Sequence, residues 1–200
     1  CLPLSNNSSI NSFSGINKVI SSIQEAVDMD PTSAIIASPS TSHLSYATEF
    51  IKNNIPVLIE KPLTTSVTEI EKFEDILKEK KELIEVAYCL RFLPAAKNLK
   101  AILEDEETLG GINSVVVEVG QYLPDWRPEI DYRHSVSANK SLGGGVLSEL
   151  SHELDYINWF FGPFSTVFCD LENTKTLEID VEDRVDAIFR NKNITVNLHM

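Results

Sequence analysis

Lys61 is the first residue whose position suggests chemistry, because it follows an apolar run in the segment Glu60-Lys61-Pro62. Residues 55–59 are almost all apolar and rich in β-branched side chains, which is typical of a buried strand in a parallel sheet. Pro62 has no backbone N–H and cannot continue the ladder of strand hydrogen bonds. Ligands of open α/β sheets bind just beyond the carboxyl ends of the strands, so Lys61 is placed to touch a cofactor. A charged surface turn is the alternative, and spacing alone does not decide between the two.

His152 is the second candidate, on a predicted helix that begins at the glycines 143–145 and ends near Phe161. Histidine is the side chain best suited to move a proton near neutral pH. Glu149, one helical turn away, would hold the tautomer of the imidazole. The pair predicts an acid–base device, and a solvated polar face is the alternative. The bulky Tyr156 and Trp159 near the same face favour the device.

The first half of the chain must position Lys61, and its pattern alternates helices with short strands. It predicts helices over 17–29, 41–53 and from the capping box Ser66/Glu69 onward, and strands over 34–37, 55–60 and 83–88. Such alternation predicts βαβ units and a parallel, doubly wound sheet. No Gly-x-Gly-x-x-Gly turn occurs in the sequence, so either that turn was lost with a missing N-terminal segment or the sheet is not a dinucleotide-binding fold.

The second half must position His152, and its pattern differs. It predicts helices over 94–105 and 143–161, an acidic loop over 104–111, a long loop over 124–142, and strands over 114–122, 166–170, 184–190 and 194–198. This favours an α+β domain with a mostly antiparallel open sheet. We therefore predict two domains, over 1–90 and 91–200. The first residue is Cys1 and the last predicted strand reaches the chain end, so we expect a fragment truncated at both ends.

Composition narrows the class of protein. The chain has 30 acidic and 17 basic residues and a net charge of −13, which argues against nucleic acids and anionic membranes as partners. The three cysteines are far apart and not in metal-ligand spacing, so neither a disulfide framework nor a metal site is expected. There is no long apolar run or signal peptide, and we expect a cytoplasmic protein.

Four motifs in this order resemble the Gfo/Idh/MocA family, the glucose–fructose oxidoreductases, inositol dehydrogenases and their relatives. They are residues 34–39 with His43; Glu60-Lys61-Pro62; Tyr88 with Arg91, Phe92 and Pro94; and residues 143–147 with Glu149, His152, Asp155 and Trp159. The resemblance covers nearly the whole chain. It implies a partial NAD(P)-binding Rossmann domain over 1–90, without its first βαβ unit, and a substrate-binding and dimerisation domain over 91–200. One departure is that the family usually has Asp four residues before the histidine, where this chain has Glu149 three before.

The resemblance implies an enzyme that transfers a hydride between NAD or NADP and the CH–OH group of a sugar or polyol. Lys61 would polarise the reacting oxygen, His152 would be the general base, and Glu149 would support it. Cofactor-binding residues would be Ser38, Pro39, His43, Glu60, Lys61 and Arg91. The family's open second-domain sheets imply a homodimer or homotetramer. A sensor of the same fold without turnover and an NAD-dependent glycosidase are the alternatives.

The segment 121–133 is the least like the family and suggests the substrate. Arg127 and Arg133 lie beside Trp126 and Tyr132, a set that could clamp a carboxylate or phosphate. With Tyr156, these residues are the predicted substrate-binding group, and they suggest an acidic or nucleotide-linked sugar. A structural loop with surface arginines is the alternative.

Overall fold

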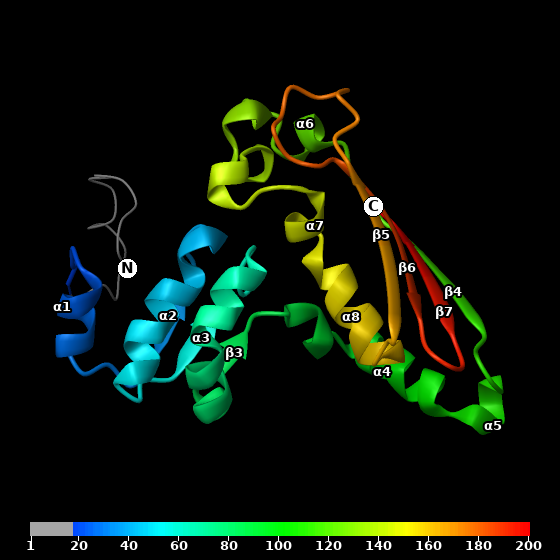
Figure 1. Ribbon diagram of the computed structural model, residues 1–200, viewed down its shortest axis with the longest axis horizontal. Coiled ribbons are helices and arrows are strands. Elements are labelled where there is room, and N and C mark those ends of the chain that lie inside the picture. Colours follow the sequence, from blue (N-terminus) through cyan, green and yellow to red (C-terminus); the bar gives the residue numbers. More distant parts are fainter. Residues whose placement is uncertain (1–17) are drawn as a thin grey trace. The chain divides into compact units, whose positions relative to one another are not determined.

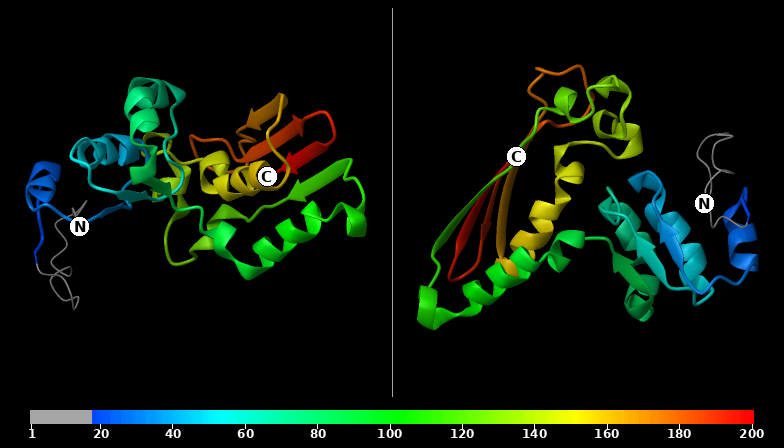
Figure 2. Two further views of the ribbon diagram at one scale, coloured as in Figure 1. Left: turned by 90° about the horizontal axis from the view of Figure 1, so that it is seen from below. Right: turned by 180° about the vertical axis from the view of Figure 1, so that it is seen from behind.

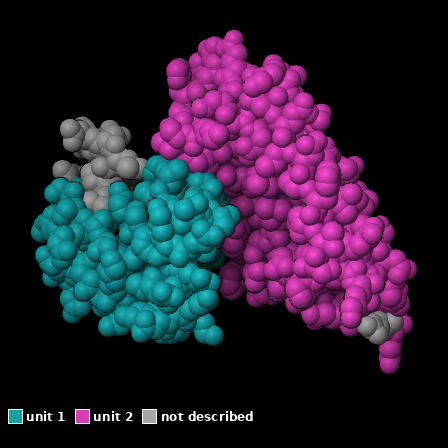
Figure 3. All heavy atoms as spheres, viewed as in Figure 1, with its two compact units in different colours: residues 1–87 teal, residues 88–200 magenta. Residues whose placement is uncertain are grey.

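The computed structural model describes residues 18–200, and of Glu106 only the backbone. The chain divides into two compact units between Ala87 and Tyr88, coloured separately in Figure 3. Each unit has its own hydrophobic core and is described by itself. In the described part of the chain, no helix is long and apolar enough to cross a membrane.

Unit 1 is built on a parallel sheet of three strands in the order β1-β2-β3 (Figure 1). These are β1 (Ala34–Ile36), β2 (Val57–Ile59) and β3 (Ile84–Val86). Its helices are α1 (Ile23–Asp28), α2 (His43–Lys52) and α3 (Val67–Glu79), with 3-10 turns η2 (Ser40–Ser42) and η3 (Lys81–Leu83). The predicted parallel α/β arrangement is confirmed.

The core of unit 1 lies on one face of this sheet. Ile36, Val57 and Ile59 are buried there against Ile51 of α2, and all three helices contribute side chains. Each buried methylene stabilises the fold by about 0.8 kcal/mol. The residues between them on the strands point the other way, and Ile35 is 74% exposed. Strand alternation thus turns one face to the helices and leaves the other bare.

Two details of unit 1 correct the sequence predictions. The helix predicted over 17–29 begins only at Ile23, and Asn17 lies outside the described residues. The capping box does not form: Ser66 is the N-cap residue of α3 but its side chain makes no cap bond. Instead the Thr64 hydroxyl donates to Glu69 and accepts the Ser66 N–H. A hydroxyl two residues upstream therefore replaces the predicted cap.

Unit 2 packs helices on a four-stranded sheet in the order β4-β7-β6-β5 (Figure 2). The strands are β4 (Ser114–Glu118), β5 (Thr166–Glu172), β6 (Arg184–Arg190) and β7 (Thr195–His199). The β5–β6 and β6–β7 pairs are antiparallel and β4–β7 is parallel, which confirms a mostly antiparallel sheet. The remaining elements are η4 (Cys89–Phe92), α4 (Pro94–Glu104), α5 (Glu106–Leu109), α6 (Leu123–Trp126), η5 (Tyr132–His134), η6 (Val136–Ala138), η7 (Lys140–Leu142), α7 (Val146–Glu149) and α8 (Ser151–Phe161).

The core of unit 2 lies between α7, α8 and one face of the sheet. Ile157 of α8 is buried against Val185, Val196 and Leu198 of the strands. The opposite face is bare, and one row across it carries Val116, Ile188 and Phe168, which are 61%, 39% and 62% exposed. We call this the outer face of the sheet.

The prediction of a single helix over 143–161 is wrong. The chain leaves helical geometry at Leu150 (φ −98°, ψ 28°) and forms two helices, α7 and α8. The start of α7 is tied to the segment before β6: Val146 N–H donates to the Glu182 carbonyl and Leu147 N–H to its carboxylate. Gly145 has φ +114°, a left-handed value that favours glycine. These contacts set the direction of α7 independently of α8.

The two predicted loops of unit 2 also contain helical structure. The acidic segment predicted as a loop over 104–111 forms α5, and the segment 124–142 contains α6 and three 3-10 turns. Local side-chain bonds shape these turns, as Ser135 and Asn139 each accept a backbone N–H of the turn that follows. Such Asx and Ser turns leave no apolar period for a sequence pattern to reveal.

Candidate functional site

In unit 1 the buried His43 joins the two segments that follow β1 and β2. Its ring is 1% exposed. Nδ1 lies 2.8 Å from the Pro62 carbonyl oxygen and Nε2 lies 2.8 Å from the Ser38 carbonyl oxygen. Both partners are backbone carbonyl oxygens, which accept hydrogen bonds from an imidazole N–H. His43 therefore holds the Ser38 and Lys61-Pro62 segments in register at the carboxyl ends of the strands.

These segments carry the predicted cofactor residues. Glu60 follows β2 directly and is exposed, and Lys61 and Ser38 are half-buried. The Ser42 hydroxyl donates to the Ser38 hydroxyl at 2.8 Å, and Pro39 accepts from the same Ser42 group. A carboxylate acceptor, an ammonium donor and a hydroxyl that can do both match the hydroxyl and amide groups of a nicotinamide riboside. The residues present fit that half of a dinucleotide, and the glycine turn that would hold the pyrophosphate is not in the sequence.

In unit 2 His152 is the second residue of α8 and packs against Tyr88. The two rings meet edge to face, with centroids 5.6 Å apart and an interplanar angle of 78°. Burial raises the pKa of Tyr88, so its phenol stays neutral at physiological pH. The contact is thus one between two rings without a charged phenolate, and it restricts the orientation of the imidazole.

One turn further along α8, Asp155 binds Arg91 in two parallel hydrogen bonds. The Arg91 Nε and Nη2 atoms lie 2.8 and 2.7 Å from the two carboxylate oxygens. This pairing raises the pKa of Arg91. The guanidinium also lies 5.6 Å from the centre of the Trp159 ring, and Lys100 lies 5.3 Å from it. Arg91, a predicted cofactor residue, is therefore bound within unit 2 and fastens η4 to α8.

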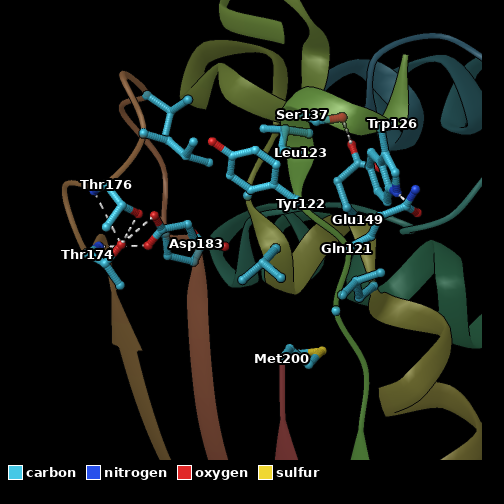
Figure 4. Close-up of a pocket in the computed structure, with 17 residues that line it drawn as sticks. Gln121, Tyr122, Leu123, Trp126, Ser137, Glu149, Thr174, Thr176, Asp183 and Met200 are labelled. Carbon is cyan, nitrogen blue, oxygen red and sulfur yellow. Dashed lines mark hydrogen bonds between the residues drawn. The ribbon is translucent and has the colours of Figure 1, made fainter. Parts of the chain in front are cut away.

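Glu149, the predicted partner of His152, is the last residue of α7 and lies before the break at Leu150. Its Oε1 atom accepts the Ser137 hydroxyl at 3.0 Å. It lines a cavity of about 200 Å³ where β4, β5 and β7 end (Figure 4). The walls also include Tyr122 and Trp126 from the segment after β4, and Thr174, Thr176 and Asp183 from the loop between β5 and β6.

The predicted substrate segment has two parts with different surroundings. Trp126 lines the cavity, and its indole N–H donates to the Gln121 side chain. Arg127 and Tyr132 line a small neighbouring hollow with Leu123. Tyr156, on α8, packs against the hydrophobic core, and burial raises its pKa to about 12.

Arg133 forms ion pairs within the chain. Its Nη2 atom lies 2.7 Å from Asp131 and its Nη1 atom 2.8 Å from Glu178. The hydrogen bonds from Arg133 lower the pKa of Asp131 to about 2, so the carboxylate stays charged at neutral pH. These two acids already bind the guanidinium that the sequence assigns to a substrate anion.

Sequence reasoning missed the far walls of the cavity. Thr174, Thr176 and Asp183 come from a loop whose residues have no periodic pattern, and Ser137 lies in a 3-10 turn. Thr174 donates its backbone N–H and hydroxyl to Asp183 at 2.7 and 2.8 Å. The order of the strands in the sheet brings these residues to Glu149, and no local motif signals it. Among the described residues, no group of three or more histidines, cysteines or acids is arranged to hold a metal ion.

The chain matches known proteins along both units. Residues 5–88 match the family described as "Oxidoreductase family, NAD-binding Rossmann fold", and residues 97–200 match the "GFO/IDH/MocA C-terminal domain". The rhizopine catabolism protein MocA of Rhizobium meliloti is 25% identical over 82% of this chain and 48% of its own length. Inositol 2-dehydrogenase 2 of Mycolicibacterium vanbaalenii is 27% identical over 74% of this chain and 40% of its own length.

A solved structure with the same fold is that of GenD2 from gentamicin A biosynthesis, in complex with NAD. It has a TM-score of 0.72 and 20% identity, and the match covers 90% of this chain and 52% of that one. The chain spans about half the length, or less, of these three proteins. From the matches to both of its domains, the chain belongs to the Gfo/Idh/MocA family of oxidoreductases, whose first domain is an NAD-binding Rossmann fold.

Proposed function

We propose that the protein is an NAD-dependent oxidoreductase that interconverts a secondary hydroxyl and a carbonyl on a sugar or polyol. The observation that carries the proposal is the Lys61 segment at the carboxyl end of β2, held by the buried His43. Membership in an NAD-binding family and the inositol dehydrogenase relative support it. NADP is the second candidate cofactor.

The proposal gives Lys61 and His152 separate roles. When bound, the nicotinamide supplies the hydride acceptor. The Lys61 ammonium donates a hydrogen bond to the reacting oxygen and polarises it. The imidazole of His152 takes the hydroxyl proton as the C–H bond breaks, so the alcohol loses a hydride and a proton and becomes a carbonyl. Positioned proton transfer of this kind contributes about a hundred- to ten-thousand-fold to the rate.

Supporting groups keep these two side chains in place. His43 fixes the backbone on which Lys61 lies, and Tyr88 packs against the ring of His152. The Arg91–Asp155 pair anchors α8 one turn beyond His152. Under the proposal Glu149 contacts substrate in the cavity, and its bond from Ser137 orients it.

Steady-state kinetics of the full-length protein, measured with NAD and a panel of sugars and polyols, will test the proposal. We expect net NADH formation, and we expect Lys61→Ala and His152→Ala to lose turnover while still binding NADH. A sensor of the same fold would bind NADH without turnover in any form. A glycosidase that uses NAD transiently would release sugar without net NADH.

We further propose that the outer face of the unit 2 sheet joins copies of the protein into a homo-oligomer. Ile188 and Phe168 are neighbours on this face, and Val116 lies beyond Asn197 in the same row; all three are exposed apolar side chains. Exposed apolar surface is typical of protein–protein contacts. We also propose a cytoplasmic location, because both described cysteines, Cys89 and Cys169, are free thiols.

A further inference from the structure

The cavity at the end of the unit 2 sheet has an acidic lining. Its described lining residues include three carboxylates, from Glu149, Glu182 and Asp183, and no lysine, arginine or histidine. Each carboxylate is held by a neighbour: Glu149 by the Ser137 hydroxyl, Glu182 by the Leu147 N–H, and Asp183 by Thr174. These bonds fix the direction of the negative charge along the lining.

Part of the lining is aromatic. Tyr122 and Trp126 follow β4, and in Figure 4 Trp126 lies beside Glu149 while Thr174 and Asp183 lie on the other side. The volume of about 200 Å³ is smaller than the pockets of drug-sized ligands, which measure roughly 300–1,000 Å³. Aromatic rings that can stack on a C–H face, together with carboxylates and threonine hydroxyls, suit a single polyhydroxylated ring.

The two arginines of the segment 121–133 are not among the lining residues of the cavity. Arg133 is paired with Asp131 and Glu178, and Arg127 lines a neighbouring hollow. An anionic ligand in the cavity would be repelled by three carboxylates, whereas a positively charged group would be attracted. This charge pattern differs from the acidic sugar that the arginines of the segment 121–133 suggest.

We infer that this cavity selects the substrate by charge and takes a neutral or positively charged single-ring sugar or polyol, amino sugars above all. The inference rests on the proposed function only in taking the ligand to be a sugar or polyol. Glu149 is the residue that determines the preference, because its carboxylate comes from α7, next to the helix that carries His152. Trp126 contributes affinity that does not depend on charge.

Calorimetric titration of the full-length protein in the presence of NADH tests the inference. The probes are sugars of the same ring structure that differ in charge. They are glucose, glucosamine and glucuronate, and the same three forms of galactose. We expect the amino sugar of at least one series to bind at least about tenfold more tightly than its uronate, with the neutral sugar between them. The preference should shrink at high salt, since ion attraction is screened. Tightest binding of a uronate, or no binding by any probe, would overturn the inference.

Two matched glutamate variants locate the charge. Glu149→Gln keeps the shape of the side chain and should reduce the preference for the amino sugar over the neutral sugar several-fold. Glu107→Gln removes an exposed carboxylate of α5 that is not among the lining residues, and it should leave the preference unchanged. Equal effects of both substitutions would contradict a specific role for Glu149, and the salt dependence of the unaltered protein tests the charge selection if Glu149→Gln does not fold.

These experiments can refute the cavity inference and the proposed function independently of each other. A charge preference in the titrations without any NADH formation would overturn the proposed function and leave the cavity inference standing. NADH formation that is fastest with uronates would overturn the cavity inference and leave the proposed function standing. Trp126→Ala should weaken all bound probes by a similar factor, and selective loss of the amino sugar alone would contradict the division of roles between Trp126 and Glu149.

Discussion

The Tyr88 ring meets the ring of His152 edge to face, with centroids 5.6 Å apart. Tyr88 is the first residue of unit 2, directly after the last residue of unit 1. The general base that we propose is therefore supported by the residue at which the chain passes from one unit to the next. This relationship links the position of a functional side chain to the local fold of the connection.

Replacing Tyr88 separates ring packing from the hydroxyl. Tyr88→Phe keeps the edge contact and should retain turnover within about threefold, whereas Tyr88→Ala removes the ring and should lower kcat about tenfold or more, since misorientation of a base is costly. The pH profile of kcat should change in Tyr88→Ala only. If Tyr88→Phe is as impaired as Tyr88→Ala, the hydroxyl rather than the ring packing is what matters.

The Arg91–Asp155 pair predicts a stability effect. The Asp155 side chain is only 9% exposed, so Arg91→Ala leaves a nearly buried carboxylate without its bidentate partner and should lower the free energy of unfolding by about 1–3 kcal/mol. Arg91→Lys cannot form the planar fork and should recover only part of this. Urea unfolding measures the change in the free energy of unfolding. Lys97→Ala, at an exposed site on α4, serves as the control, with an expected change within about 0.5 kcal/mol.

His43 should be a stability determinant of unit 1. Substitution by alanine removes the bonds to both the Pro62 and the Ser38 carbonyls and leaves a space in the buried site, so we expect a loss of roughly 2–4 kcal/mol. Ser45→Ala, at an exposed site on the same helix, should change stability by a few tenths of that. Thermal unfolding compares the two variants, and equal stabilities would show that His43 does not hold the strand ends together.

The burial of Tyr156 should make the stability of the fold depend on pH in the alkaline range. Burial raises the pKa of Tyr156 to about 12 from the usual tyrosine value of 10.0. The folded state therefore binds the phenolic proton more tightly than the unfolded state. The contribution of the protonated Tyr156 phenol to the free energy of unfolding is fully present below pH 10 and is lost as the pH rises through about 12.

Denaturant unfolding at a series of pH values up to 11 measures this loss. Tyr156→Phe has no phenol to titrate, so its stability should fall less steeply than that of the unaltered protein. Tyr122→Phe, at a tyrosine that is 61% exposed, should retain the original slope. Parallel slopes for all three proteins would contradict a perturbed Tyr156.

The outer face of the sheet predicts self-association. Val116→Glu places a charge in the exposed apolar row and should shift the protein towards monomer in sedimentation velocity. Val136→Glu makes the same substitution at another exposed valine, 44% exposed and away from the strands, and should not. Association that both variants retain would place the interface elsewhere.

Much of this architecture follows from patterns in the sequence. The alternation of apolar strands and amphipathic helices predicts the parallel sheet of unit 1, since burial on one face imposes a period on residues such as Ile36 and Ile59. The break at Leu150 could not be predicted, because it depends on bonds from Val146 and Leu147 to Glu182, 35 or more positions away. Helical propensity alone favours one continuous helix there.

The site was predictable only where motifs are local. Lys61 and His152 could be selected from short segments, and their roles remain proposals. The acidic lining of the cavity could not be selected, because Asp183 and Glu149 come to one cavity only through the strand order of the sheet. Likewise Arg133 looks free for an anion in the sequence, and the fold pairs it with Glu178.

The account depends most on hydride transfer from a sugar or polyol carbon. The most direct measurement uses a substrate deuterated at the reacting carbon, with NMR of the NADH that the encoded protein forms. We predict one deuterium at the nicotinamide C4 position per carbonyl formed, and about a hundred- to ten-thousand-fold slower transfer in His152→Ala. NADH without deuterium, or transfer at an unchanged rate in His152→Ala, would contradict the account.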